Sequence, residues 1–361
     1  MSEMWINMGP QHPMTHGLWN LRVKVDGELV VDVKPEIGYL HRALEKISES
    51  RTFTQTINLV DRACYAASFS WETVYVTAVE NLMDVEVPLR AQYIRVISLE
   101  LQRIASHLVW VAAFAADLGL LTVFLYTMRD RDLVQDLLQL YTGGRLTYEY
   151  NRIGGVRNDV PDNFKDRVEK VADYLNKKID EYEDMMDKSD VFLLRTENLG
   201  ILKREDVFDY GFTGPMERGS GIKKDTRKDR PYLSYGDFDF DIPVSSDCDT
   251  YGRYRVRMEE MRQSINIIKQ ALARLPAGEV MAKKVPKYAP EGSAVSVIED
   301  PRGEALCYVV SDGTDRPYRM KLRSPGFIHI ASCPVLLRGY RVADVPSIMG
   351  GIDICIGETD R

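Results

Sequence analysis

Two histidines four positions apart, His12 and His16, are the first residues of this chain whose types and spacing could do chemistry. On a helix, such a spacing would place both imidazoles on one face, as in metal-binding pairs. Pro13 lies between them and opposes a helix, because proline lacks the amide donor and fixes φ. The segment is therefore expected to be a stiffened loop that presents imidazole, which titrates near neutral pH. A solvated histidine without a chemical role is the alternative interpretation.

Three further polar residues, Tyr65, His107 and Asp117, stand among apolar neighbours in stretches that the sequence predicts to be helical. A carboxylate in such a stretch must be paired, hydrogen-bonded or neutralised. Each residue also has a structural interpretation. Tyr65 would be a core tyrosine with a satisfied hydroxyl, His107 a histidine that packs between helices, and Asp117 half of a buried ion pair.

The chain has five cysteines, and none of them is paired in a CxxC spacing. Their positions are Cys64, Cys248, Cys307, Cys333 and Cys355. We expect free, mostly buried thiols in a reducing compartment. An iron–sulfur cluster needs about four thiolates in a recognisable spacing, so the chain is expected to hold no cluster of its own. The sequence also lacks GxGxxG, Walker A and HExxH motifs, which opposes dinucleotide binding.

The composition is that of a globular protein of 361 residues, with 45% hydrophobic and 28% charged residues. The net charge of −7 opposes nucleic-acid binding, which needs a basic surface. The most apolar stretch, residues 108–126, is interrupted by Asp117, Gly119 and Thr122. It is therefore expected to be a buried bundle helix instead of a membrane span. With no signal-peptide pattern at the start, we expect a protein that is soluble or peripheral to a membrane.

Hydrophobic periodicity divides the chain into an N-terminal β region, a helical centre and a C-terminal β region. Residues 18–34 alternate apolar and polar side chains around Asp26-Gly27, which predicts a β-hairpin. Helical patterns follow at residues 41–50, 58–83, 88–118, 122–142, 161–188 and 251–275. Short strands are expected at residues 294–298, 305–311 and 318–322, before a small helix near 342–352. The predicted fold class is α+β, in three segments: residues 1–40, 41–285 with a long ordered loop at 190–250, and 286–361.

Several long motifs occur in one order along the chain. They are MGPQHPMTHG (8–17), GYLHRALEKISESRTFTQ (38–55), DRACY (61–65), PLRAQYIRVISLELQRIASHL (88–108), NRIGGVRND (151–159), RMEEMRQSINIIKQAL (257–272), PRGEALCYVVSDG (301–313) and DICIGETDR (353–361). In these motifs the chain resembles the 49-kilodalton-type, or D-type, subunit family of respiratory complex I and related archaeal dehydrogenases. That family is related to the large subunits of NiFe hydrogenases. The resemblance implies a hydrogenase-like helical bundle between the two β regions.

The resemblance also implies a set of site residues. The family's quinone head-group ligands fall on His16 and Tyr65, and an acidic partner of that histidine falls on Asp117. Two more positions match a residue of the quinone pocket and an arginine near the terminal iron–sulfur cluster: Met14 and Arg42. The roles suit the chemistry, because imidazolium and phenol can both donate to the carbonyl oxygens of a quinone. His12 is left without a ligand role and is expected to brace its loop.

In this family the 49-kilodalton-type chain binds no redox cofactor by itself, and quinone is its substrate. The 4Fe–4S cluster that reduces the quinone belongs to a small iron–sulfur subunit of the B type. Further implied partners are a C-type subunit, a ferredoxin-like I-type subunit and a membrane subunit of the H type. The complex would lie on the cytoplasmic side of the cell membrane, with ion translocation by the membrane partners. The electron donor stays open between NADH, a reduced deazaflavin coenzyme and ferredoxin.

Departures from the related sequences sharpen these expectations. Cys64 and Cys355 match the first cysteines of two hydrogenase CxxC pairs, but Ala67 and Glu358 occupy the second positions. Two thiolates of four cannot form the nickel site, so no metal is expected, and the two cysteines are interpreted as remnants. A metal-containing hydrogenase-type subunit and a structural scaffold with a vestigial pocket stay as alternatives.

Complex I usually carries a histidine near positions 147 and 148 that couples the potential of the terminal cluster to pH. This chain has Thr147 and Tyr148 there. We therefore expect a cluster potential with little pH dependence, suited to a low-potential acceptor such as menaquinone or methanophenazine.

Overall fold

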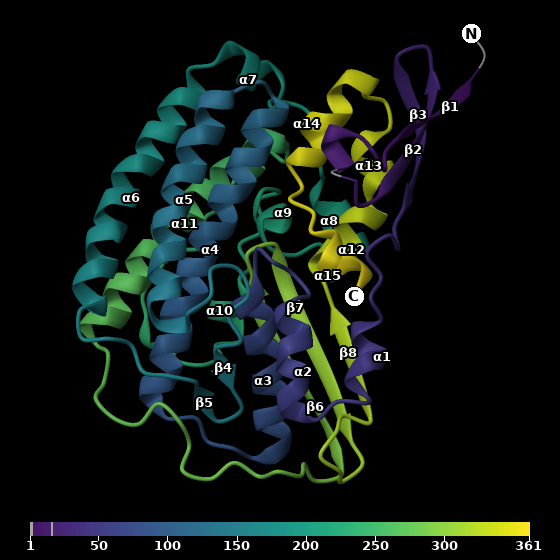
Figure 1. Ribbon diagram of the computed structural model, residues 1–361. Coiled ribbons are helices and arrows are strands. Elements are labelled where there is room, and N and C mark those ends of the chain that lie inside the picture. The colour runs from purple at the N-terminus through teal and green to yellow at the C-terminus, as the bar shows by residue number, and fades with distance from the viewer. Residues whose placement is uncertain (1–2, 16) are drawn as a thin grey trace.

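A bundle of long helices makes up the largest part of the computed structural model, which describes residues 3–15 and 17–361 (Figure 1). The bundle consists of α4 (Leu89–Asp117), α5 (Leu121–Thr142), α6 (Phe164–Asp187) and α11 (Thr250–Ala273). α4 packs against both α5 and α11, and α6 also contacts these two helices. Most side chains of α4 are buried, as expected for the centre of a bundle.

The ends of these helices follow from the local sequence. α4 begins after Pro88, because proline cannot donate the amide hydrogen bond that a helix interior requires. α5 ends at Gly143, where a φ of 82° favours glycine and the amide donates to the Gln139 carbonyl. Apart from small shifts at their ends, the structure confirms the predicted helices at residues 88–118, 122–142, 161–188 and 251–275.

The helix predicted at residues 58–83 is wrong. The structure has α2 (Phe53–Asp61) and α3 (Ser68–Met83), with a loop at residues 62–67 between them. No proline or glycine marks this break, so an uninterrupted apolar pattern hid it, and tertiary packing decided where the helices end. As a result, Tyr65 belongs to a loop and not to an apolar helix.

The N-terminal β region is an antiparallel sheet in the order β1 (Met4–Met8), β2 (Asn20–Asp26) and β3 (Leu29–Glu36). The predicted hairpin is confirmed, with Gly27 at its turn in the left-handed region at a φ of 62°. β1 was not predicted, and its five side chains do not alternate between buried and exposed. The region is therefore a three-stranded sheet and not a hairpin alone.

The C-terminal sheet has the antiparallel strands β6 (Gly292–Asp300), β7 (Gly303–Ser311) and β8 (Arg319–Arg323). These strands confirm the three that the sequence predicts. α3 packs along β6 and β7, so one face of the sheet is covered by a helix (Figure 1). A two-stranded ladder, β4 (Asn151–Arg152) with β5 (Gly155–Val156), lies in the loop between α5 and α6.

Short helices and turns fill the remaining segments. The segment at 190–250 is ordered, as expected, but it is not all loop. It contains α7 (Asp190–Leu194), α8 (Arg204–Tyr210), α9 (Pro215–Arg218), α10 (Thr226–Asp229) and η2 (Tyr235–Asp237). Elsewhere lie η1 (Pro13–Thr15), α1 (Leu44–Ser48), α12 (Pro325–Ala331), α13 (Cys333–Leu337), η3 (Val342–Asp344), α14 (Val345–Gly350) and α15 (Ile356–Asp360). η3 and α14 correspond to the closing helix expected near 342–352.

The N-terminal sheet packs against helices from the end of the chain. The Val30 amide donates to the Tyr340 carbonyl at 2.9 Å, and β3 and α13 contribute to one buried apolar cluster. Figure 1 shows α13 beside β2 and β3. The α+β class is confirmed. The division into residues 1–40, 41–285 and 286–361 stays a prediction.

Among the described residues, no helix is both long enough and apolar enough to cross a membrane. The apolar stretch 108–126 is divided between α4 and α5, and Gly119 adopts a φ of 85° in the turn between them. Val111 and Phe114 are buried in the bundle, whereas Leu121 is 60% exposed. The expected bundle helix is thus confirmed for α4, while the beginning of α5 faces outward.

Candidate functional site

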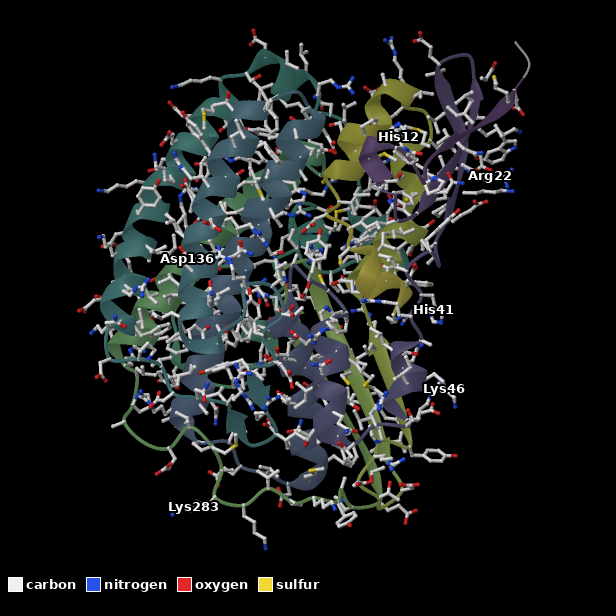
Figure 2. The ribbon with its side chains drawn as sticks, viewed as in Figure 1. His12, Arg22, His41, Lys46, Asp136 and Lys283 are labelled. Atoms are coloured by element: carbon white, nitrogen blue, oxygen red, sulfur yellow. The ribbon has the colours of Figure 1, made fainter. Side chains whose placement is uncertain are left out.

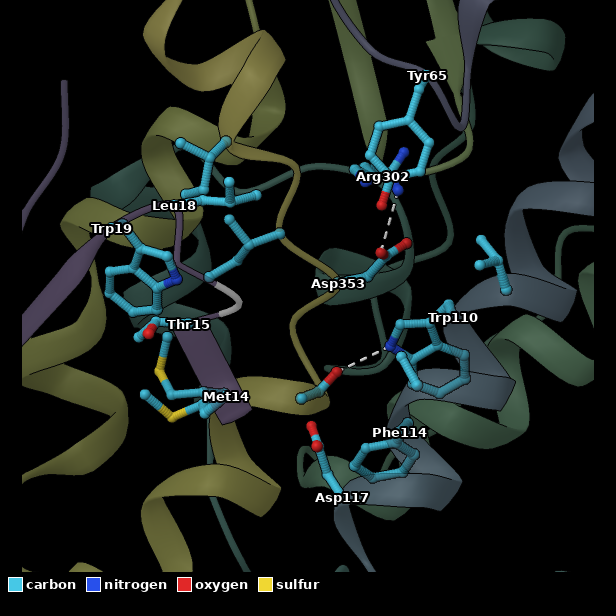
Figure 3. Close-up of a pocket in the computed structure, with 16 residues that line it drawn as sticks. Met14, Thr15, Leu18, Trp19, Tyr65, Trp110, Phe114, Asp117, Arg302 and Asp353 are labelled. Carbon is cyan, nitrogen blue, oxygen red and sulfur yellow. Dashed lines mark hydrogen bonds and ion pairs between the residues drawn. The ribbon is translucent and has the colours of Figure 1, made fainter. Parts of the chain in front are cut away.

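A cavity lies where the N-terminal loop, the end of α4 and the segment after α14 meet (Figure 3). Its lining combines apolar walls with a few polar groups, as ligand pockets commonly do. The apolar lining residues are Met14, Leu18, Trp19, Val109, Trp110, Ala113, Phe114, Met349, Ile354 and Ile356. The polar or small lining residues are Thr15, Tyr65, Asp117, Arg302, Gly350 and Asp353.

Three of the predicted site residues, Met14, Tyr65 and Asp117, come together at this cavity. His16 lies outside the described residues. Thr15, the residue before it, lines the cavity. Thr15 and Asp117 therefore line the same cavity. Asp117 is the carboxylate that the family resemblance pairs with His16.

Tyr65 reaches the cavity from the loop between α2 and α3, and the residue is 56% exposed. Figure 3 shows its hydroxyl pointing toward Arg302. Loss of water around the hydroxyl raises the pKa of Tyr65, and the nearby Cys355 sulfur adds to this rise. The Arg302 guanidinium opposes the rise, because it favours the phenolate. The phenol is therefore neutral and able to donate a hydrogen bond at physiological pH.

Asp117 is the last residue of α4 and lies at the end of the cavity away from Tyr65 (Figure 3). A negative charge at a helix C-terminus is unfavourable, so this carboxylate does not serve the stability of the helix itself. Gly350 lies nearby, since a Cβ atom there would lie 2.8 Å from the Phe114 ring and 3.9 Å from Asp117 Oδ2. The half-buried carboxylate lines the cavity.

An ion pair that the sequence did not predict, Arg302 with Asp353, forms another part of the wall (Figure 3). Arg302 Nη2 lies 3.2 Å from Asp353 Oδ1, and both side chains are buried. Arg302 follows β6, whereas Asp353 adopts a φ of 61° in the segment after α14. The sequence motifs contain both residues, Arg302 in the motif at 301–313 and Asp353 in the motif at 353–361.

Side chains of α4 and α11 bind the backbone at the end of α14 and just after it, which forms one wall of the cavity. Trp110 Nε1 donates to the Gly350 carbonyl at 2.8 Å. Arg257 donates to the carbonyls of Gly351 and Ile352 at 3.0 and 3.1 Å, and its guanidinium lies 4.3 Å from the centroid of the Trp110 ring. Burial lowers the pKa of Arg257 to about 10, which leaves the side chain charged at neutral pH. These contacts satisfy the backbone of the wall and fix its position.

The loop in front of the cavity is braced by its own hydrogen bonds. The Met14 amide donates to His12 Nδ1 at 3.2 Å, and the Thr15 hydroxyl donates to the Pro10 carbonyl at 2.9 Å. Gly9 adopts a φ of 125°, and a Cβ atom there would lie 2.6 Å from a backbone oxygen, so the position requires glycine. Figure 2 shows His12 in this loop, beside the helices from the end of the chain. These contacts agree with the bracing role expected for His12.

A second cavity adjoins Tyr65 on the side of Arg42 and Arg62. Arg42 is exposed, and its Nη2 donates to the Arg62 carbonyl at 2.8 Å. Leu40 and Thr147 also line this cavity. Two arginines and an exposed tyrosine thus share one face of the molecule.

His107 reaches neither cavity. It is buried in α4, and its Nε2 lies 2.8 Å from Glu260 Oε2. Burial lowers the pKa of His107, so the neutral ring donates to the carboxylate. Glu260 also pairs with Arg218 at 2.7 Å. The structural interpretation of His107 as a histidine that packs between helices is confirmed.

A buried cluster of possible metal ligands lies close to Tyr65. Its ligand atoms, from Cys64, Cys355 and Glu358, all lie within 4.8 Å of one another. Glu358 accepts from Trp71 Nε1 at 3.2 Å and from the Ser324 hydroxyl at 2.9 Å, and burial raises its pKa to about 7. The five cysteines are free, and four of them are buried, as expected. That the chain holds no metal stays a prediction.

Comparisons with known proteins assign the chain to one family. Residues 117–291 and 286–361 match the family described as "Respiratory-chain NADH dehydrogenase, 49 Kd subunit". The NADH-quinone oxidoreductase D subunit of Desulforamulus reducens is 47% identical over 360 residues, which cover 99% of this chain and 98% of that protein. The corresponding D subunits of Geotalea uraniireducens and Bacillus mycoides are 44% and 43% identical, again over 99% of this chain and 98% of each relative.

These similarities define a complex I-type subunit, that is, one chain of an oxidoreductase complex. The chain belongs to the family of 49-kilodalton subunits of the respiratory-chain NADH dehydrogenase. The family resemblance that the sequence motifs indicated is thereby confirmed.

Proposed function

We propose that this chain forms, together with a small iron–sulfur subunit, the site at which a terminal 4Fe–4S cluster reduces a membrane quinone. The observation that carries the proposal is that Tyr65, Asp117 and the residue before His16 line one cavity. The relatives are named as D subunits of NADH-quinone oxidoreductase, which supports quinone as the class of substrate.

Reduction of a quinone to a hydroquinone takes up two electrons and two protons. The cluster of the partner subunit supplies the electrons. Tyr65 is proposed to donate to one carbonyl oxygen of the head group and His16 to the other. Asp117 would orient His16 and favour its charged form. Trp110 and Phe114, whose rings stack on each other, supply an apolar part of the wall for the quinone ring.

Arg302 has a supporting role in this proposal. Once Tyr65 has given up its proton, the phenolate needs a positive charge nearby, because the pocket is poorly solvated. The Tyr65 hydroxyl points toward Arg302, and the guanidinium favours the phenolate. Asp353 keeps Arg302 in place through the ion pair at 3.2 Å. We therefore propose Arg302 and Asp353 as positioning residues of the site.

The face around the second cavity is proposed to receive the small iron–sulfur subunit. Arg42 is exposed there, and the cavity that it lines also includes Tyr65, so a cluster beside Arg42 would be close to the quinone. C-type, I-type and H-type subunits are proposed to complete the complex on the cytoplasmic side of the cell membrane. Ion translocation belongs, in this proposal, to the membrane partners. NADH, a reduced deazaflavin coenzyme and ferredoxin stay as candidate donors.

The acceptor is proposed to be a low-potential carrier such as menaquinone or methanophenazine. Thr147 lines the second cavity, and burial raises the pKa of Tyr148, so neither side chain changes protonation near neutral pH. The cluster potential should therefore change by far less than about 59 mV per pH unit. A redox titration of the assembled complex at several pH values measures this slope. A slope near one proton per electron would contradict the expectation.

The central experiment replaces the two proposed donors in the assembled complex. We expect Tyr65→Phe and His16→Ala to lower quinone reduction by about 10²-fold each, because each removes a proton donor. Tyr288→Phe is the matched control, since Tyr288 is 57% exposed and does not line the cavity. Quinone-reductase rates are compared with subunit composition on native gels. Full activity of both variants in an intact complex would favour the scaffold with a vestigial pocket.

A hydrogenase-type metal centre is the other function to test. Cys64 and Cys355 could supply two thiolates, while Ala67 and Glu358 occupy the positions of the other two. Metal analysis of the purified complex separates the two functions. Stoichiometric nickel would contradict the quinone proposal.

A further inference from the structure

Two thiols that have no part in the proposed quinone chemistry face each other beside Tyr65. The Sγ atoms of Cys64 and Cys355 lie within 4.8 Å of each other and of a carboxylate oxygen of Glu358. Cys64 comes from the loop after α2, and Cys355 directly precedes α15. The fold thus brings together two thiols from opposite ends of the sequence.

The two thiols differ in their electrostatic surroundings. Arg302 Nη1 donates to the Cys64 sulfur at 3.5 Å. A hydrogen bond from the Cys64 thiol, together with the Arg302 charge, lowers the pKa of Cys355 to about 7. Burial raises the pKa of Cys64 well above its usual range. The pair therefore consists of two thiols with different surroundings whose sulfur atoms lie within 4.8 Å of each other, so a modest movement brings one within reach of the other.

Two other buried cysteines lie in different surroundings. Burial raises the pKa of Cys307, and it raises the pKa of Cys333 to about 12. The Cys333 sulfur lies 3.9 Å from the thioether sulfur of Met349, which cannot form a disulfide. Cys307 and Cys333 are therefore expected to stay unreactive, and they provide internal controls.

A metal ion is the competing occupant of the cluster. Arg302 opposes it, because a guanidinium 3.5 Å from the Cys64 sulfur would repel a second cation. The two carboxylate oxygens of Glu358 already accept hydrogen bonds, one from Trp71 and one from Ser324. A metal would have to share a carboxylate oxygen with one of these donors. The surroundings thus favour thiol chemistry over metal binding.

Access to the pair comes through the second cavity. Cys355, which is 5% exposed, lines that cavity together with Tyr65 and Gly357, whereas Cys64 does not line it. Cys64 lies behind it and is 1% exposed. A thiol that lines a cavity in front of a protected thiol suits stepwise oxidation to a disulfide.

We propose that Cys64 and Cys355 form a redox-active dithiol that a peroxide converts into a disulfide. The Cys355 thiolate attacks one oxygen of hydrogen peroxide, so an S–O bond forms, the O–O bond breaks and hydroxide leaves. That hydroxide takes up the proton that Cys355 released on ionisation. The Cys64 sulfur then attacks the sulfenic sulfur, and the hydroxyl leaves as water with the Cys64 proton. In total, two thiols and one peroxide give one disulfide and two water molecules.

The disulfide would change the surroundings of the quinone cavity. The two sulfurs must approach to about 2.05 Å, which draws the loop of Cys64 toward the segment of Cys355. Tyr65 directly follows Cys64, so its hydroxyl would move with that loop. We therefore expect the disulfide to lower quinone reduction and a dithiol reductant to restore it. This consequence alone rests on the proposed function.

Thiol mapping of the wild-type complex tests the dithiol directly. The complex is treated with hydrogen peroxide, its remaining thiols are alkylated after unfolding, and its peptides are analysed by mass spectrometry. We expect this chain to lose two of its five free thiols and to yield one peptide pair joined through Cys64 and Cys355. Dithiothreitol should restore both thiols. Cys307 and Cys333 should remain open to alkylation in every sample.

Two variants provide matched controls. Cys355→Ala should abolish the joined peptide and leave Cys64 reduced, because the accessible nucleophile is gone. Cys248→Ala removes a partly exposed cysteine outside the cluster and should leave the joined peptide unchanged.

Several results would overturn the proposal. The first is full alkylation of Cys64 and Cys355 after peroxide treatment, and the second is oxidation of Cys355 to a sulfinic acid without the bridge. A copurifying metal that protects both thiols until a chelator removes it would assign the cluster to metal binding instead. Because mapping of the wild type needs no variant, misfolding of Cys355→Ala leaves the test intact. The joined peptide is also scored independently of quinone reduction, so failure of either proposal can be distinguished.

Discussion

Buried acids have different electrostatic surroundings in the helical bundle and in the wall of the cavity. At the bundle, Arg218 of α9 lies 2.7 Å from Glu260 of α11 and 2.9 Å from Glu299 of β6, and Arg227 of α10 lies 3.1 Å from Glu100 of α4. Burial alone would raise the pKa values of Glu100 and Glu260, but the arginine charges outweigh it and lower both. Burial and the nearby Asp225 charge raise the pKa of Glu299. The bundle is thus held by nearly balanced ion pairs.

At the cavity, by contrast, one arginine serves several acids. Arg302 pairs with Asp353, and Asp300 and Glu358 lie in its surroundings. Burial raises the pKa of Asp300 to about 8 and that of Glu358 to about 7. Asp300 therefore keeps its proton near neutral pH and Glu358 is close to half protonated, whereas Glu100 and Glu260 have lost their protons. The difference indicates that the bundle uses charge for stability, while the cavity wall retains protons beside a site proposed to consume them.

The largest effect should come from breaking the bundle network. Arg218→Met leaves Glu260 and Glu299 without a main cation, and we expect the free energy of unfolding to fall by about 3–5 kcal/mol. Urea unfolding followed by circular dichroism measures the change. Arg230→Met, at an exposed arginine, is the control and should have little effect. Equal stability of the two variants would remove the distinction between bundle and cavity.

A smaller effect on the free energy of unfolding, per pH unit, is expected at the cavity wall. Its pH dependence is opposite to that of an acid paired with a cation. The pKa of Asp300 is about 8 in the folded chain against 3.8 for an ordinary aspartate, so the folded state binds this proton more tightly. Its contribution to stability is present below the unfolded pKa and is lost as the pH rises through the folded pKa. The slope is at most about 1.4 kcal/mol per pH unit.

Asp300→Asn should therefore flatten the pH dependence of the free energy of unfolding between the two pKa values. Denaturant titrations at several pH values measure it, with Asp312→Asn at an exposed aspartate as the control. Parallel curves for Asp300→Asn and the wild type would mean that Asp300 does not hold its proton.

The smallest effect is expected at the surface of the bundle. Lys188 lies 2.5 Å from Asp184, but the two side chains are 73% and 64% exposed. Water screens such a pair, so Lys188→Gln should change the free energy of unfolding by less than about 0.5 kcal/mol. The same urea titration measures it. A loss as large as that of Arg218→Met would show that burial does not determine the value of ion pairs in this chain.

The long helices could be predicted from the sequence because their apolar faces repeat over many turns. α4 and α11 bury whole stripes of side chains, and such patterns fix both the type and the length of an element. The break between α2 and α3 could not be predicted. It has no glycine or proline, and it depends on contacts with residues that lie far away in the sequence.

Residues of the candidate site could be predicted from the sequence where a single motif contains them. Met14 and Tyr65 lie in matched motifs, Asp117 was assigned through the family resemblance, and the structure brings all three to one cavity. The Arg302–Asp353 pair was missed, because neither residue stands out among its own neighbours and the ion pair exists only in three dimensions. The approach of Cys64 to Cys355 could not be predicted for the same reason, although the motifs single out each cysteine separately.

The joining of β3 to the end of the chain has a consequence for protein synthesis. Val30 binds Tyr340 through the backbone, and the Gly38 amide donates to the Asp360 carboxylate at 2.9 Å. On the ribosome, the apolar face of the N-terminal sheet would stay uncovered until α13 and α14 have been translated, and such long-range pairing forms slowly. We therefore expect the nascent chain to need a chaperone, and the iron–sulfur partner to be added only after translation has passed α15.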